Sequence, residues 1–250
     1  MSFITVQGKR LEYELVRTGA PVMVFLHEGL GSLALWKDFP AQVSARTGAP
    51  ALVYSRYGYG QSDPIAAPRR VDFMYEEALE SLPALLAALG IENPILIGHS
   101  DGASIALIHA GARRWAVRGL ILEAPHVFVE EFTVKSIEAA RDVYRTTDLR
   151  QRLQRYHAET DSAFWGWNDI WLDPAFRSWN IEAALLGVTC PVLAIQGADD
   201  EYGTLSQLDA IERGVRGPLE RLVLAQCKHS PHRDQPAATL AAMARFIDAL

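Results

Sequence analysis

Short runs of apolar, mostly β-branched residues alternate along this chain with longer segments in which apolar residues recur every three or four positions. The short runs favour buried strands, and the longer segments favour amphipathic helices. Such an alternation is typical of a mostly parallel sheet covered by helices. With 250 residues, of which 49% are hydrophobic, the chain is long enough to bury a full-sized core around one sheet. The predicted strands lie at 4–6, 11–16, 22–27, 51–54, 95–98, 119–122, 192–196 and 222–225.

Two helices can be located from their ends. Between residues 75 and 89 the apolar spacing predicts a helix that Gly90 ends and that Pro83 kinks or restarts. Near the C-terminus, Pro236 stands at a typical first helical position, and apolar residues follow it at helical spacing. We expect this last helix to close the fold.

One region breaks the alternation. From about residue 126 to 186 no run resembles a strand, yet this segment contains four of the six tryptophans. We interpret 126–186 as a helical cap inserted into a core made of 1–125 and 187–250. Clustered tryptophans more often anchor a small core of their own than touch substrate, but we expect some of them to line a pocket. The candidate substrate contacts in the cap are Trp165, Trp167 and Trp171.

The charge balance argues against nucleic acid and anionic membranes as partners. Lys and Arg number 24 against 30 Asp and Glu, and the basic clusters are no longer than pairs such as Arg69-Arg70. The first ten residues lack the apolar core of a signal peptide, and no apolar run approaches the roughly 18 residues of a membrane span. We therefore expect a cytoplasmic protein with a small-molecule partner, and its oligomeric state stays open. The two cysteines, Cys190 and Cys227, are expected to be free thiols.

The most informative motif is Gly98-His99-Ser100-Asp101-Gly102, which follows a predicted strand and precedes a helix-forming stretch. A serine in such a tight turn is held in a strained conformation, and its hydroxyl stands free at the N-terminus of the helix. A Gly-rich turn between a strand and a helix can also be purely structural. The flanking elements and the partners found downstream favour Ser100 as a nucleophile.

A serine nucleophile needs a histidine to take its proton and a carboxylate to orient that histidine. Asp199 and Asp200 follow the predicted strand at 192–196, and His229 and His232 follow the last predicted strand. The order serine, aspartate, histidine, each after a different strand, separates this arrangement from other serine hydrolase folds. The histidine pair lacks a third ligand, so we expect no metal site there.

On these residues and their order, the chain resembles the α/β-hydrolase superfamily over its whole length apart from the variable cap. The resemblance implies an α/β fold in which a mostly parallel, eight-stranded sheet is flanked by helices. It also implies acyl-enzyme chemistry at Ser100.

The resemblance further assigns the acid and the base. The family's acid lies three residues after a glycine, which corresponds to Asp200, with Asp199 as the alternative. Glu123 ends a predicted strand where some relatives carry their acid, so it is a second alternative. The family's histidine loop matches His229 better than His232, which then has the role of a hydrogen-bonding group in the loop.

The oxyanion hole needs two backbone N–H donors aimed at the developing negative charge. The resemblance implies Asp101 as one donor and Gly29, in the loop after the strand at 22–27, as the other. The family usually has glycine where this chain has Glu28. We expect the Glu28 carboxylate to form a hydrogen bond within its loop, and we keep Glu28 as a candidate substrate contact. We expect the Asp101 side chain to point away from the oxyanion.

This set of residues predicts hydrolysis of an acyl compound through an acyl-enzyme, with no cofactor. Serine at the nucleophile position argues against dehalogenase and epoxide hydrolase activities, whose relatives use aspartate. A compact aromatic cap suits a small or medium apolar acyl group, so a carboxylesterase is the first expectation. A thioesterase, lactonase, amidase or carbon–carbon bond hydrolase would use the same triad, and perhydrolysis would differ only in the second nucleophile. A slow-turnover ligand-binding receptor is the alternative of another class.

Overall fold

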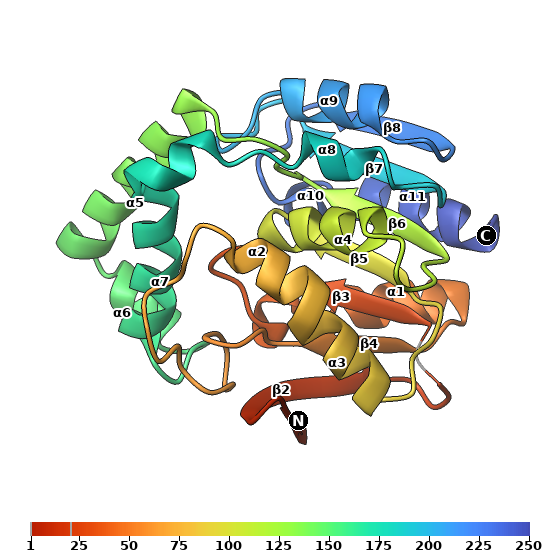
Figure 1. The fold of residues 1–250 in the computed structure, drawn as a ribbon, viewed down its shortest axis with the longest axis horizontal. Helices are drawn as coiled ribbons and strands as arrows, with labels where there is room; N and C mark the ends of the chain where they lie inside the picture. Colours follow the sequence, from red (N-terminus) through yellow and green to blue (C-terminus); the bar gives the residue numbers. More distant parts are fainter. Residues whose placement is uncertain (1, 21) are drawn as a thin grey trace.

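The computed structural model describes residues 2–20 and 22–250, which form one eight-stranded sheet flanked by helices (Figure 1). The strands are β1 (Ser2–Val6), β2 (Lys9–Val16), β3 (Met23–Leu26), β4 (Ala51–Tyr54), β5 (Ile95–His99), β6 (Gly119–Glu123), β7 (Val192–Gly197) and β8 (Leu219–Leu224). Their order in the sheet is β1-β2-β4-β3-β5-β6-β7-β8. β2 runs antiparallel to both β1 and β4, and the remaining neighbours are parallel. The mostly parallel sheet predicted from the sequence is therefore confirmed.

All eight predicted strands are present, and β8 departs furthest from its prediction. It begins at Leu219 rather than at residue 222, because its first residues pair with Val192 and Leu193 of β7. β8 is an edge strand and most of its residues are only half-buried. Polar residues on such an edge interrupt the apolar run that marks interior strands.

The strand order changes direction at the centre of the sheet. The chain passes from β3 to β4 on one side and then crosses back to β5 on the other side of β3. In open parallel sheets, ligands bind in the crevice at the carboxyl ends of the two strands that flank such a switch point. In this protein the crevice lies between the loop after β3, which carries Gly29, and the turn after β5, which carries Ser100.

Side chains alternate between the two faces of the sheet. Met23 of β3 packs into a cluster with α1 (Phe39–Thr47) and α11 (Pro236–Asp248). The next residue, Val24, packs into a larger cluster on the opposite face with α4 (Asp101–Gly111). α11 begins at its proline, as predicted, and lies against α1.

The segment predicted as one helix between 75 and 89 is divided into three parts. These are α2 (Phe73–Glu76), a π-helical turn (Glu77–Ser81) and α3 (Leu82–Ala88). The residues at both junctions keep helical dihedrals, and the N–H of Leu82, just before Pro83, donates to the carbonyl of Glu77. The three parts therefore form one continuous helix whose hydrogen-bonding pattern changes before Pro83, and the predicted restart is not observed.

The chain between β6 and β7 is helical, and its first three helices form a layer of their own at the left of Figure 1. Its last helix packs against α4 and α9 rather than with this outer layer. The boundaries predicted for the cap, 126–186, stay a prediction. Among the described residues no helix has the length and apolar character needed to cross a bilayer. The elements are α5 (Glu131–Thr146), α6 (Leu149–Leu153), α7 (Thr160–Leu172), a 3-10 turn (Pro174–Ser178) and α8 (Glu182–Leu185), and α9 (Ser206–Gly214) follows β7.

Candidate active site

Ser100 occupies the sharp turn between β5 and α4. Its backbone has φ 54° and ψ −117°, a conformation that residues with a side chain rarely adopt. A Cβ on Gly98 would collide with the carbonyl of Gly102, and a Cβ on Gly102 would collide with the carbonyl of Leu26 in β3. Both glycines are therefore required for α4 to start this close to the sheet. The turn has the strain that the motif predicts.

Asp200 follows β7, and its carboxylate accepts hydrogen bonds on both oxygens. Oδ1 accepts from Nδ1 of His229 at 2.8 Å and from the backbone N–H of Tyr202 at 2.8 Å, and Oδ2 accepts from Gln196 at 3.2 Å. Burial alone would raise the pKa of Asp200, but the charge and hydrogen bonds of its partners outweigh burial and hold the pKa at about 2. The carboxylate is therefore ionised and keeps the proton of a neutral His229 on Nδ1, which leaves Nε2 as the acceptor.

The alternative acids and the second histidine have other partners. The Asp199 side chain is exposed, and its backbone N–H donates to a carbonyl of the histidine loop. Glu123 is fully buried, and its Oε2 accepts from the backbone N–H and from Nδ1 of His232, at 3.0 and 2.9 Å. Two separate carboxylate–histidine contacts result. Within residues 2–20 and 22–250, no cluster of three or more His, Cys, Asp or Glu side chains could hold a metal ion.

The backbone of His229 is held on both sides. Its N–H donates to the carboxylate of Glu201 at 3.1 Å. Its carbonyl lies 2.7 Å from Nε2 of His99, at the end of β5. The loop that carries His229 is thus attached to the loop after β7 and to the strand that leads into Ser100.

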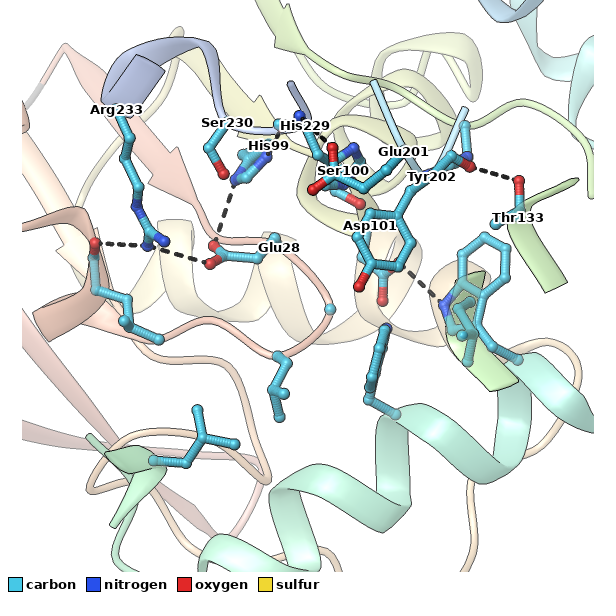
Figure 2. A pocket seen from close by; sticks show the side chains of 18 residues that line it. Glu28, His99, Ser100, Asp101, Thr133, Glu201, Tyr202, His229, Ser230 and Arg233 are labelled. Carbon is cyan, nitrogen blue, oxygen red and sulfur yellow. Dashed lines mark hydrogen bonds and ion pairs between the residues drawn. The ribbon is translucent and has the colours of Figure 1, made fainter. Parts of the chain in front are cut away.

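Ser100 and His229 line the same cavity of about 260 Å³, at the switch point of the sheet (Figure 2). The loops after β3, β5, β6, β7 and β8 form one side of this cavity. Residues of α5, α6 and α7 form the other side. The structure therefore brings the predicted nucleophile and the predicted base to one concave site.

Buried polar contacts hold the loop after β3, which carries Gly29. Nδ1 of His27 donates to the carbonyl of Glu28 at 2.7 Å, and its Nε2 accepts from the backbone N–H of Arg56 at 3.0 Å. The buried Arg56 guanidinium donates to the carbonyls of His27 and Glu28 at 3.3 and 2.9 Å. Burial and the Arg56 charge lower the pKa of His27, so its ring is neutral, as these hydrogen bonds require.

The Glu28 carboxylate finds its partners outside its own loop, which corrects the expected hydrogen bond within the loop. It lies 3.4 Å from Nδ1 of His99 and 3.5 Å from the guanidinium of Arg233 in α10 (Pro231–Asp234). Burial would raise the pKa of Glu28, but the hydrogen bond and the charges of these partners hold it well below its usual range. A Cβ on Gly31 would collide with this carboxylate, which fills the space above the glycine. Glu28 also lines the cavity, where the sequence predicted it as a candidate contact.

The Asp101 side chain lies in the cavity, contrary to the expectation that it points away. Its Oδ1 accepts from the indole N–H of Trp171 at 3.2 Å, and this contact holds the carboxyl group in the site. Its buried Oδ2 has no hydrogen-bonding partner among the described residues and would lie 3.0 Å from a Cβ built on Gly29. Burial raises the pKa of Asp101, against the opposing charges of Arg56 and Arg69.

Of the three tryptophans predicted to contact substrate, Trp167 and Trp171 line the cavity. These two residues are one helical turn apart on α7 and share a face. Trp165 is about 200° around the helix from Trp167, so it belongs to the opposite face. There it packs against Tyr144 and lies under the guanidinium of Arg145. Trp167 and Trp171 stay candidate substrate contacts, and Trp165 lies outside this cavity.

The sequence analysis missed several residues that border the cavity, among them His126, Tyr202 and Arg233. Burial and the charge of His229 lower the pKa of His126 to about 3, so its ring is neutral at physiological pH. His126 follows β6, and a search for polar residues just after the carboxyl end of each strand would have found it. Residues of the cap helices, such as Thr133, carry no comparable signal.

Comparisons with known proteins agree with this fold. Residues 23–242 match the model of the Alpha/beta hydrolase family. A 2-succinyl-6-hydroxy-2,4-cyclohexadiene-1-carboxylate synthase from Enterobacter sp. (strain 638) is 25% identical over 92% of this chain and 93% of that protein. Serine hydrolase BPHL from Mus musculus is 25% identical over 92% of this chain and 80% of that protein. The crystal structure of the enol-lactonase from Burkholderia xenovorans LB400 has a TM-score of 0.77 at 18% identity, covering 99% of this chain and 100% of that one.

The family match spans β3 to α11 and therefore includes the turn of Ser100 and the loops of Asp200 and His229. The sheet order and the serine turn described above are independent of that match and agree with it. This chain belongs to the alpha/beta hydrolase family.

Proposed function

We propose that the protein is a serine hydrolase that cleaves a carboxylic ester through an acyl-enzyme on Ser100. His229 acts as the base, and Asp200 orients it. The observation that carries this proposal is the meeting, at one cavity, of a serine in a strained turn and a histidine whose Nδ1 lies 2.8 Å from a buried carboxylate. This combination of groups activates serine hydroxyls for acyl transfer.

The reaction proceeds in two halves. Nε2 of His229 takes the proton of Ser100 as Oγ attacks the ester carbonyl, and then gives that proton to the departing alcohol. Water next attacks the acyl-enzyme, with His229 again taking and returning a proton. The second half releases the carboxylic acid and restores the serine.

Two backbone N–H groups stabilise the oxyanion in this proposal. The N–H of Asp101 is the first of α4, so it has no intrahelical partner, and the dipole of this helix favours negative charge at that end. The N–H of Gly29 is the second donor. Its loop is fixed by the buried contacts of His27 and Arg56, which prepares the donor before the substrate arrives.

The cavity favours a small or medium acyl group. Its volume of about 260 Å³ lies just below the roughly 300–1,000 Å³ of pockets for drug-sized ligands. Leu30, Trp167 and Trp171 supply apolar surface, and Oδ2 of Asp101 is a buried acceptor that has no partner in the part of the chain that the structure describes. Because such an acceptor is unfavourable when left unpaired, the substrates that fit best carry an apolar body with one hydrogen-bond donor near the ester carbonyl.

The test is fluorophosphonate labelling with mass spectrometry, run beside p-nitrophenyl esters of increasing acyl length. We expect an adduct on Ser100 and turnover that is highest for short acyl chains. Ser100→Ala should abolish both, whereas Ser230→Ala, which changes the other serine of the cavity, should keep the adduct. An unlabelled protein, or an adduct that survives Ser100→Ala, would overturn the proposal.

The other candidate functions share the adduct and differ in turnover. Thioesters, lactones, amides and carbon–carbon substrates presented to the labelled protein distinguish the alternative hydrolases. Labelling without turnover on any acyl donor is the result expected of a slow ligand-binding receptor. No contact in the structure favours that alternative over the ester hydrolase.

A further inference from the structure

His99 is a buried side chain that lies between the loop of Gly29 and the loop of His229 (Figure 2). It is the last residue of β5, directly before Ser100, and it is 1% exposed. Its Nε2 lies 2.7 Å from the carbonyl oxygen of His229, and its Nδ1 lies 3.4 Å from Oε2 of Glu28. His99 therefore bridges the loop that carries Gly29, the proposed oxyanion donor, and the loop that carries His229, the proposed base.

The protons on this ring follow from its partners. A carbonyl oxygen only accepts, so Nε2 of His99 must carry a hydrogen and donate it to His229. In a neutral ring Nδ1 would then be a bare acceptor facing the Glu28 carboxylate, which also only accepts. A bare Nδ1 beside an ionised carboxylate at 3.4 Å is electrostatically unfavourable, whereas a protonated Nδ1 forms an ion pair with it. The geometry therefore favours hydrogens on both nitrogens, and hence an imidazolium.

The charged groups near His99 favour this protonation state. Burial alone would lower the pKa of His99, but the hydrogen bond and the charge of Glu28, with Glu123 farther away, raise it above its ordinary value. Arg233 contacts the other side of the Glu28 carboxylate and keeps that carboxylate ionised.

Three aromatic rings complete the surroundings. Two of them belong to histidines that pair with carboxylates of their own, Asp200 and Glu123. The third is an indole, which carries no charge. The ring centroids lie 5.2 Å away for His229, 5.2 Å for His232 and 6.2 Å for Trp36.

We propose that His99 is a positioning residue: as an imidazolium it ties the carboxylate of Glu28 to the carbonyl of His229. It thereby holds the loop of the Gly29 donor and the loop of the base at a fixed separation. This inference rests on the proposed function, because it matters for catalysis only if the oxyanion forms between these loops. A displacement of about 1 Å at such a site can lower a rate by about 100-fold.

When the His99 imidazolium loses one proton, its contact with the Glu28 carboxylate is broken at Nδ1. Nε2 keeps its hydrogen because the His229 carbonyl has no other donor to replace it, so the proton leaves from Nδ1. The Glu28 carboxylate is then repelled by the lone pair and turns towards Arg233 and solvent. We expect an alkaline limb in kcat that follows the titration of His99.

The first test measures the ring directly. In nitrogen-15 spectra of the histidine side chains, His99 should carry hydrogens on both nitrogens at neutral pH. Glu28→Gln should lower the pKa of His99 by at least one unit and move the alkaline limb of kcat by the same amount. Arg233→Gln removes a positive charge beyond Glu28, so it should move both quantities slightly in the opposite direction. A wild-type His99 with one ring hydrogen at neutral pH would overturn the proposal.

The second test separates positioning from general packing. His99→Gln keeps an N–H for the His229 carbonyl but carries no charge, so kcat should fall about 10-fold and the alkaline limb should disappear. His99→Phe keeps the ring volume and removes both donors, and the expected loss is about 100-fold. Gly31→Ala leaves both charged residues in the chain but pushes the Glu28 carboxylate aside, and it should lower the pKa of His99 as Glu28→Gln does.

Failure of this inference is distinguishable from failure of the proposed function. If wild-type protein is not labelled at Ser100, the hydrolase proposal fails, while the His99 titration and its response to Glu28→Gln are still measurable. If labelling and ester turnover occur but Glu28→Gln leaves the His99 pKa and the alkaline limb unchanged, the positioning role alone is wrong.

Discussion

Two of the carboxylate–histidine contacts in this corner of the protein, Asp200–His229 and Glu123–His232, differ in what surrounds them. Asp200 contacts His229 at 2.8 Å and Glu123 contacts His232 at 2.9 Å, so the two contacts are nearly equal in length. The His229 side chain is 12% exposed and borders the cavity. The His232 side chain is 3% exposed and packs against the ring of Trp36.

This difference shows that a carboxylate–histidine contact does not define a catalytic pair. Glu123 receives both the side chain and the backbone N–H of His232, so it fastens the start of α10 to the end of β6. Asp200 leaves one ring nitrogen of His229 available to a cavity that also contains a serine. A reactive pair differs from a structural one because its histidine is accessible from the cavity and because a serine lies in the same cavity. The carboxylate–histidine contact itself does not separate them.

The strongest test of the comparison is to remove the carboxylate charge of the pair that borders the cavity. Asp200→Asn should lower kcat by about 10⁴-fold, because the asparagine no longer selects the required histidine tautomer. It should also lower the melting temperature modestly, because the contribution of the ionised carboxylate to stability is lost. Asp199→Asn is the matched control and should retain wild-type kcat. Both quantities are measured by ester hydrolysis and thermal melting. If Asp199→Asn is the crippling change, the assignment of the acid is wrong.

The second change removes the carboxylate charge of Glu123, in the pair that does not border the cavity. Glu123→Gln should lower the free energy of unfolding by about 3 kcal/mol, because it weakens two hydrogen bonds that a buried carboxylate accepts from His232. Urea titration measures this loss. The kcat of the folded fraction should change far less than in Asp200→Asn. A variant with wild-type stability and a 10⁴-fold lower kcat would show that the roles of the two pairs had been exchanged.

The smallest expected effect is on stability in acid. The folded-state pKa of Asp200, about 2, lies below its ordinary value of 3.8. Its contribution is therefore complete above about pH 4 and is lost as the pH falls towards 2, by about 2 kcal/mol in total. Urea midpoints of Asp200→Asn should fall less steeply over this interval than those of wild-type protein. Asp199→Asn should keep the wild-type slope, and equal slopes in all three proteins would contradict the lowered pKa.

Much of the fold could be predicted because its strands are buried on both faces and leave continuous apolar runs in the sequence. The runs at 95–98 and 119–122 match β5 and β6 to within one residue. The beginning of β8 was misplaced because an edge strand tolerates polar residues. Pro83 marked a local change in the helix, but the form of that change, a π-helical turn in a continuous helix, depends on packing that no local pattern records.

The candidate site shows a similar limit. Ser100, Asp200 and His229 follow strand ends, and strand ends could be predicted. The directions of two carboxylates could not, because the Asp101 side chain is held by Trp171 of the cap and the Glu28 side chain by His99 and Arg233. These partners are distant in sequence and become neighbours only in the folded chain.

Gly31 and Glu28 lie in one loop, and the residue at each of these two positions limits which residue the other position can accept. The space above Gly31 is occupied by the carboxylate of Glu28, so an alanine there would first have to displace that group. If residue 28 were shortened beforehand, the nearest obstacle to alanine at 31 would be gone, and only the Cβ of His27, 2.9 Å from the new methyl group, would still have to shift. The order of the two changes therefore matters. If alanine is introduced at position 31 first, the single variant has a Glu28 carboxylate that is displaced from His99. If residue 28 is changed first, that variant does not arise.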